Sequence, residues 1–247
     1  MVVWKNTTEF SPAPIDLASY AAGRDLTLPP LDGDRRDPVL IVDSSAWEDL
    51  WSHARSADVE VGGLLVGEVF QDEVTERPVT LVRAAIPALG GASSLASFTF
   101  TPAAWDHLTS ERDQFWPEMI TVGWFHTHPN LGVFYSGTDR TTQHAFFNRP
   151  WNVGIVVDPF AWSDQVGLFL GANSSRLPFE NIVIAPDLVP VASGRSPVAP
   201  AMLPPPSAAR AAWEVYGPRV AAAAVGTAAA VVAAVVARRI RTQRWGP

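Results

Sequence analysis

Two histidines, an aspartate, a serine and a glutamate are spaced so that they could form a hydrolytic metal site. An apolar run, Ile120 to Phe125, predicts a buried strand that delivers His126 and His128. Side chains two residues apart on a strand point to the same face, so both imidazoles can converge on one ion. Pro129 ends this strand, because proline has no N–H to give to the ladder.

An oxygen ligand is expected from the helix that follows. Ser136 or Asp139 is placed to cap a helix that runs through residues 140–147, and Asp139 stands in its first turn. Two neutral nitrogens and one carboxylate leave a tetrahedral zinc ion one open position for water, as in catalytic sites. The sequence therefore predicts that His126, His128 and Asp139 bind Zn²⁺.

Hydrolysis at such a site also needs a base. Glu60 begins an apolar, Gly-rich run that predicts a strand, so it could lie beside the end of the histidine strand. We expect Glu60 to take a proton from water and pass it to the leaving amine. The Ser136 hydroxyl would donate to the developing oxyanion. Glu68 is a less well placed alternative base, and a helix cap is the purely structural alternative for Ser136.

The order of these residues resembles the JAMM motif of the MPN (JAB/Mov34-type) zinc metallopeptidases, in a bacterial member. Glu60 is followed by His-x-His-Pro and then, with six residues between the proline and the serine, by Ser-x-x-Asp. The resemblance implies an α+β, MPN/JAB-like (cytidine-deaminase-like) fold: a mixed curved β-sheet flanked by helices. It also implies a zinc-dependent isopeptidase or peptidase that cleaves after the C-terminal tail of a ubiquitin-like or sulfur-carrier protein. A catalytically silent MPN scaffold is the alternative from another functional class.

Composition narrows the choice of chemistry. The 247-residue chain has no cysteine, which excludes disulfides, a thiolate zinc site and a cysteine nucleophile. His, Asp and Glu remain as strong metal ligands. The net charge of −7 argues against a nucleic-acid partner, which usually meets a basic face.

The expected metallopeptidase domain spans residues 38–185. An arm, residues 1–37, precedes it and is either disordered or lies along the domain surface. Apolar runs predict strands, and amphipathic or capped segments predict two further helices. The predicted strands are 39–43, 61–70, 79–86, 97–101, 120–125, 151–158 and 166–171, and the helices are 44–55 and 102–115. Five residues are interpreted as ordinary structural side chains: His53, His107, His144, Trp124 and Phe125.

The C-terminal part differs in composition. Residues 186–212 form a Pro- and Ala-rich segment that predicts an extended linker. Residues 213–247 contain an apolar run, Val220–Ala237, followed by four arginines, which predicts a transmembrane helix. Because the N-terminus shows no signal peptide, the expected location is the cytoplasmic face of the membrane, held by a single-pass C-terminal anchor. An Ala-rich helix that packs against a partner is the alternative.

Overall fold

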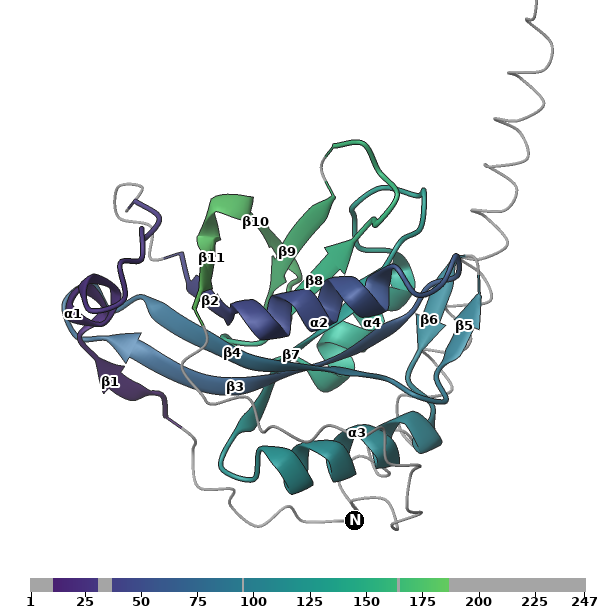
Figure 1. Ribbon diagram of the computed structural model, residues 1–247, viewed down its shortest axis with the longest axis horizontal. Helices are drawn as coiled ribbons and strands as arrows, with labels where there is room; N and C mark the ends of the chain where they lie inside the picture. The colour runs from purple at the N-terminus through teal and green to yellow at the C-terminus, as the bar shows by residue number, and fades with distance from the viewer. Residues whose placement is uncertain (1–10, 31–36, 95, 164, 187–247) are drawn as a thin grey trace, which may run out of the picture.

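The computed structural model describes residues 11–30, 37–94, 96–163 and 165–186, which form a mixed β-sheet covered by helices on both faces (Figure 1). In these residues the main sheet has the strand order β10-β9-β8-β7-β3-β4-β2-β11, and β1 also pairs with β3. The helices are α1 (Leu17–Ala22), α2 (Ser44–Ala54), α3 (Pro102–Phe115), α4 (Gly137–Phe146) and the short 3₁₀ helix η1 (Phe179–Asn181). The strands of the sheet are β1 (Ala13–Ile15), β2 (Val39–Asp43), β3 (Gly62–Asp72), β4 (Pro78–Pro87), β7 (Ile120–Thr127), β8 (Val153–Val157), β9 (Val166–Leu170), β10 (Ser175–Leu177) and β11 (Ile182–Ala185). A separate hairpin is formed by β5 (Ala92–Ser94) and β6 (Ser97–Thr99).

The long strand β3 lies in the middle of the sheet and gives it its curl. It is antiparallel to β4 and to β7, and its register shifts between Val66 and Gly67 against β4 and between Leu65 and Val66 against β7. Such bulges bend a strand and increase its twist. Gly67 is required here, because a Cβ would lie 1.8 Å from the carbonyl oxygen of Leu81.

Each face of the sheet is buried by a different set of helices. Helix α2 packs Ala46, Leu50 and Ala54 against one face. On the other face α3 contributes Trp105 and Leu108 to a second core, and Figure 1 shows α2 and α3 on opposite sides of the sheet. Because β3 is covered on both sides, it carries a nearly continuous apolar run instead of an alternating one.

The N-terminal arm lies on the domain surface over its described part, residues 11–30. Strand β1 pairs in parallel with β3, and Ile15 lies opposite Asp72. The Asp72 carboxylate then accepts a hydrogen bond from the backbone N–H of Leu17 at 3.0 Å. Leu17 is buried in a third apolar cluster, with side chains of β2, β4 and β11. Of the two predicted states of the arm, the structure shows the docked one for these residues.

The sequence predicted the regular elements better than the short ones. Strand β2 and helix α3 have the predicted bounds, and β3, β4, β7, β8, β9 and α2 match their predictions within two residues at each end. The predicted α+β sheet flanked by helices is confirmed. Elements β1, α1, β10, η1 and β11 were not predicted. All are short, and β1 and β11 are stabilised by pairing with strands that are distant in the sequence.

The predicted transmembrane assignment is corrected. Among the residues that the structure describes, no helix is both long and apolar enough to cross a membrane. The longest of them, α3, has 14 residues, about 21 Å of helix against a hydrocarbon core of about 30 Å. The predicted C-terminal helix, within residues 213–247, and the predicted linker, residues 186–212, lie outside the described residues apart from Pro186. The structure therefore gives no support to a membrane anchor.

Candidate metal centre

Strand β7 brings the two motif histidines to the same buried point. His126 lies opposite Gly62 of β3 and Val156 of β8, and His128, just beyond the strand, donates its backbone N–H to Val157 at 2.8 Å. Both imidazoles are almost fully buried. Their Nε2 atoms are 3.1 Å apart, so the predicted convergence of the two side chains is observed.

Helix α4 supplies the carboxylate. Its N-cap is Ser136, whose hydroxyl oxygen accepts the backbone N–H of Asp139 at 3.2 Å. The Asp139 carboxylate accepts the Ser136 N–H in return, at 2.6 Å, which completes a capping box. This cap fixes the side chain of Asp139, and its two oxygens lie 3.2 Å from Nε2 of His126 and 3.5 Å from Nε2 of His128.

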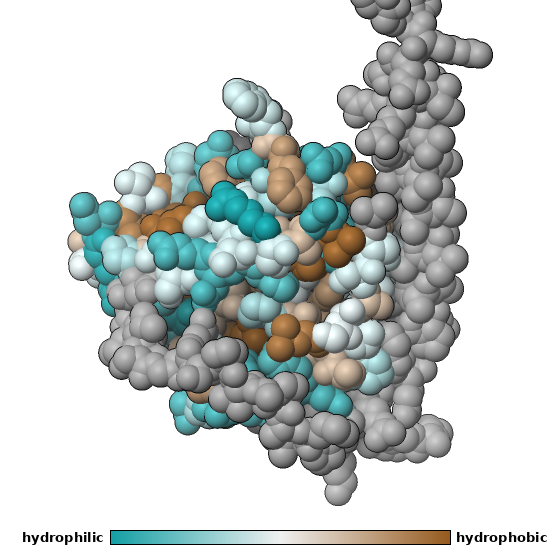
Figure 2. Space-filling view, turned by 45° about the vertical axis from the view of Figure 1, so that its right-hand side comes forward, coloured by the Kyte–Doolittle hydropathy of each residue, from teal (hydrophilic) through white to brown (hydrophobic). Residues whose placement is uncertain are grey.

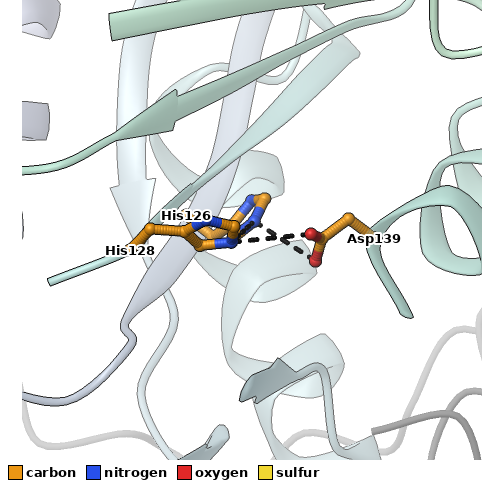
Figure 3. Close-up of side chains that lie close together, drawn as sticks. All are labelled: His126, His128 and Asp139. Carbon is orange, nitrogen blue, oxygen red and sulfur yellow. Dashed lines mark hydrogen bonds and ion pairs between the residues drawn. The ribbon is translucent and has the colours of Figure 1, made fainter. Parts of the chain in front are cut away.

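The three donor groups fit a zinc ion. Two atoms bound at about 2.0–2.1 Å to one tetrahedral zinc lie about 3.3 Å apart, and the separations between His126, His128 and Asp139 are 3.1, 3.2 and 3.5 Å. Figure 3 shows the two imidazoles and the carboxylate pointing toward one another. Two nitrogens and a carboxylate, without a thiolate, leave room for a fourth ligand, as catalytic zinc requires.

The protonation states favour metal binding at two of the three groups. Burial lowers the pKa of His126, which keeps this imidazole neutral. Burial alone would raise the pKa of Asp139, but the two histidines outweigh it and hold this pKa well below its usual range. Burial would also lower the pKa of His128, but Asp139 and Glu60 outweigh it and raise this pKa. Neutral imidazole and ionised carboxylate are the forms that bind metals.

Glu60 lies beside this donor set, just before β3. Its backbone N–H donates to the carbonyl of Ser94 in the β5–β6 hairpin at 2.8 Å. Its carboxylate is buried, with Oε1 3.8 Å from Nε2 of His128. Burial, aided by the nearby charge of Asp139, raises the pKa of Glu60 to about 8. A divalent cation at the donor set would lower this pKa again, because an opposite charge favours the ionised form.

The alternative base, Glu68, is engaged elsewhere. Its carboxylate accepts a hydrogen bond from Nε of Arg83 at 3.1 Å. The same guanidinium binds Asp43 at 3.0 Å through its NH1 nitrogen. Among the described residues, the cluster of possible metal ligands consists of the two motif histidines and Asp139, so the structure brings Glu60 rather than Glu68 to the site.

Asp158, the last residue of the predicted strand 151–158, supports the histidine loop. This buried carboxylate accepts the backbone N–H groups of Asn130 and Gly132, both at 2.9 Å. The carbonyl of Gly132 lies 3.1 Å from Nδ1 of His128, so Nδ1–H can donate to it while Nε2 faces the donor set. A hydrogen bond to the ring nitrogen that does not bind the metal fixes the tautomer and the ring orientation of a histidine ligand. The sequence signal was slight: a polar residue at the end of a strand that flanks the histidine strand.

His126 is oriented by stacking. Its Nδ1 has no hydrogen-bond partner among the described residues, but its ring stacks on Trp124 with centroids 4.4 Å apart and planes at 10°. The indole N–H of Trp124 donates to Oε1 of Gln143 at 2.6 Å. Trp124 is buried as predicted, and the supporting role of Gln143, on helix α4, was not predicted.

Comparison with known proteins identifies the domain. Residues 43–163 match the family described as prokaryotic homologs of the JAB domain. The rpn11 regulatory subunit of the 26S proteasome of Schizosaccharomyces pombe is 35% identical over 124 residues, 49% of this chain and 38% of that protein. The ubiquitin carboxyl-terminal hydrolase RPN11 of Saccharomyces cerevisiae is 32% identical over 131 residues, 51% of this chain and 40% of that protein.

One solved structure is also similar to this chain, and the curated relatives match only part of it. The solution structure of protein DSY2949 from Desulfitobacterium hafniense has 21% identity and a TM-score of 0.45, over 61% of this chain and 95% of that one. The chain spans less than half the length of these two curated relatives. The family match runs from helix α2 through strand β8 and includes all five motif residues, so this part of the chain is a prokaryotic JAB domain of the JAB/MPN family.

Proposed function

We propose that this chain is a zinc-dependent isopeptidase or peptidase that hydrolyses the bond after the C-terminal tail of a ubiquitin-like or sulfur-carrier protein. The observation that carries the proposal is the buried convergence of His126, His128 and Asp139 within 3.5 Å of one another, with Glu60 beside them. Membership of the JAB/MPN family supports a hydrolase. The name of the Saccharomyces cerevisiae relative, a ubiquitin carboxyl-terminal hydrolase, supports a ubiquitin-like substrate, and the sulfur-carrier alternative rests on the resemblance of the motif to the MPN metallopeptidases.

Each residue has a distinct role in this proposal. His126, His128 and Asp139 would hold the ion. Zinc, when bound, supplies Lewis-acid chemistry, which polarises a carbonyl and lowers the pKa of water toward about 7. The carboxylate of Glu60 accepts a proton from the attacking water and delivers it to the departing nitrogen. Burial keeps Glu60 away from bulk solvent, which preserves its proton for the leaving group.

Ser136 can serve the fold and the reaction at once. A hydroxyl has two acceptor lone pairs and one donor hydrogen. Ser136 uses an acceptor position for the N–H of Asp139, which leaves its O–H free to donate to a substrate oxygen. Its side chain is half-buried at the edge of the site, where a substrate carbonyl can reach it. The cap and the oxyanion donor are therefore compatible roles of one side chain.

A catalytically silent scaffold is the alternative function. Burying two carboxylates and two imidazoles costs free energy unless a partner compensates their charge. Glu60 would not stabilise a scaffold. Its carboxyl group is buried, its pKa is raised, and it lies beyond hydrogen-bonding distance of His128. The preserved ionisable groups favour the enzyme.

The test combines metal analysis and hydrolysis with the full chain. Wild-type protein should contain about one zinc per chain, removable by a chelator. The substrate for the hydrolysis assay is a ubiquitin-like protein with a fluorophore attached through an amide to its C-terminal glycine. Glu60→Gln should retain zinc and lose at least about 100-fold in rate, the usual contribution of a general base. Glu68→Gln is the matched control, since Glu68 binds Arg83, and it should hydrolyse at the wild-type rate. Metal-free wild-type protein, or an active Glu60→Gln variant, would contradict the proposal.

A further inference from the structure

A hollow of about 980 Å³ lies between helix α2, the segment before β9 and the 3₁₀ helix η1. We call it the aromatic groove. Four aromatic side chains line it: Trp47 and Trp51 of α2, Trp162 of the segment before β9, and Phe179 of η1. It lies on the face of the sheet that α2 covers, opposite α3 (Figure 1).

The aromatic walls of the groove are unusually open to solvent. Trp162 is fully exposed, at 102%, and Phe179 is 52% exposed. Trp47 and Trp51 are half-buried and meet edge to face, with centroids 6.1 Å apart. The face of the molecule drawn in Figure 2 is mainly hydrophilic or intermediate, with scattered hydrophobic areas. An open groove lined by several large aromatic side chains is typical of a binding surface, because contiguous exposed apolar patches mark interaction sites.

The chemistry of the groove matches an extended proline-rich peptide. Grooves lined by aromatic rings bind polyproline II helices, whose rings pack on indole faces and which lose little entropy on binding. Two carboxylates, Glu48 and Glu180, also line the groove, so its rim favours a basic residue beside the prolines. The guanidinium carbon of Arg55 lies 4.8 Å from the centroid of the Trp51 ring, so a basic side chain already stacks on this wall of the groove.

Such a peptide is present in the same chain. Residues 195–206 read Arg-Ser-Pro-Val-Ala-Pro-Ala-Met-Leu-Pro-Pro-Pro. In a polyproline II helix, which has three residues per turn, Pro197 and Pro200 would share one edge, about 9 Å apart. Arg195 precedes them and supplies the positive charge that the acidic rim favours.

The point at which the chain leaves the domain favours docking within one molecule. Ala185, the last residue of β11, lies opposite Asp43, and helix α2 begins at the next residue, Ser44. The chain thus departs at the end of α2 that carries Trp47. The twelve residues from Ala185 to Pro197 span up to about 37 Å in a polyproline II conformation, and the 11 residues of α2 are about 16 Å long. The segment is therefore long enough to reach any part of the groove.

We propose that residues 195–206 of this chain bind in the aromatic groove of the same molecule, with prolines on the tryptophan rings and Arg195 at the acidic rim. The groove is then an intramolecular docking site that fixes the course of the chain after β11. This role uses none of the residues assigned to hydrolysis.

Cysteine cross-linking tests this proposal directly, because the natural chain has no cysteine. One variant of the full chain carries Ser52→Cys, on an exposed groove residue, and Ala199→Cys, between the two prolines. The matched control carries Gln114→Cys, exposed on α3 at the opposite face, with the same Ala199→Cys. Dilute protein is oxidised, and the rate of intramolecular disulfide formation is followed by non-reducing gel and peptide mass spectrometry.

Docking predicts that the groove pair closes about tenfold or more faster than the control pair, because binding raises the effective concentration above that of the tether alone. Trp162→Ala should slow closure of the groove pair about tenfold or more, to the rate set by the tether alone, without unfolding the domain, since Trp162 is fully exposed. Pro197→Ala with Pro200→Ala should do the same. Equal rates for the two pairs would overturn the proposal, as would rapid closure that survives both sets of substitutions. Disulfides formed mainly between two chains would assign the groove to a second molecule and overturn intramolecular docking.

Discussion

Replacing Asp158 by Asn should weaken zinc binding more than it weakens the fold. One carboxylate oxygen of Asp158 accepts the N–H groups of Asn130 and Phe160, at 2.9 and 3.1 Å, and the other accepts Gly132 at 2.9 Å. An asparagine can keep an oxygen at the first position. It must then direct its NH₂ group at the N–H of Gly132, so the substitution removes the branch that orients His128.

The expected loss can be estimated from this geometry. A hydrogen bond to a charged acceptor contributes about 1.5–3 kcal/mol, and the lost branch contains one such bond, from Gly132 to Asp158. At about 1.4 kcal/mol per tenfold change, that is roughly a 10- to 100-fold loss of zinc affinity, the range usual for partners of metal ligands. The bonds from Asn130 and Phe160 are retained, so we expect the metal-free domain to unfold within a few degrees of wild type.

The measurement is zinc competition against a chromophoric chelator, with the melting temperature of the metal-free protein recorded alongside. Asp113→Asn is the matched control: this carboxylate is 62% exposed and pairs with Arg112 on the surface, so zinc affinity should not change. A zinc affinity for Asp158→Asn within about twofold of wild type would refute the reasoning. So would a loss of affinity that simply follows a large loss of stability, because Asp158 would then stabilise the fold rather than position His128.

Two further predictions concern residues that join the site or the arm to the domain. Ser136→Ala should lower kcat by on the order of 100-fold with little change in KM, as loss of an oxyanion donor does, and should cost about 1 kcal/mol of stability through the lost cap; a change in KM alone would assign Ser136 to structure. Burial opposes ionisation of Asp72, but hydrogen bonds from Thr75 and Leu17 outweigh it and lower its pKa. Its stabilising contribution should therefore be full above the unfolded-state pKa of about 3.9 and be lost as the pH falls through the lower folded-state value. Melting curves of Asp72→Asn and wild type should differ most near pH 7 and converge toward pH 2, and a difference independent of pH would contradict this assignment.

The sequence predicted those features that depend on local pattern. The apolar run before His126 indicated a buried strand, and the two-residue spacing placed both imidazoles on one face, as the 3.1 Å separation of their Nε2 atoms confirms. The helix start at Ser136 was visible because capping depends on residue types three positions apart. Glu60 was harder to place, since its position depends on the pairing of β3 with β7, yet the strand that it precedes was clear.

Features that depend on contacts between distant residues were not predictable in the same way. Asp158 binds the loop 26 to 28 residues before it, and an Asp-Pro pair after a strand is an ordinary turn sequence. Gln143 accepts the indole N–H of Trp124 from 19 residues away. Strand β1 has three residues and little buried surface of its own, and it is held by pairing with β3 and by the bond from Leu17 to Asp72 across 55 residues. No periodicity in such segments indicates their partners.

Asp139 shows why a sequence cannot separate a structural role from a chemical one at this site. A serine followed three residues later by an acidic residue is a signature of a helix start, and the same two residues complete the proposed metal centre. The structure shows that the roles coexist because the carboxylate has two oxygens, each with more than one lone pair. One oxygen accepts the N–H of Ser136 at 2.6 Å and lies 3.5 Å from Nε2 of His128, and the other lies 3.2 Å from Nε2 of His126. Formation of the first turn of α4 therefore places the third donor group, and any substitution at Asp139 changes the start of the helix and the centre together.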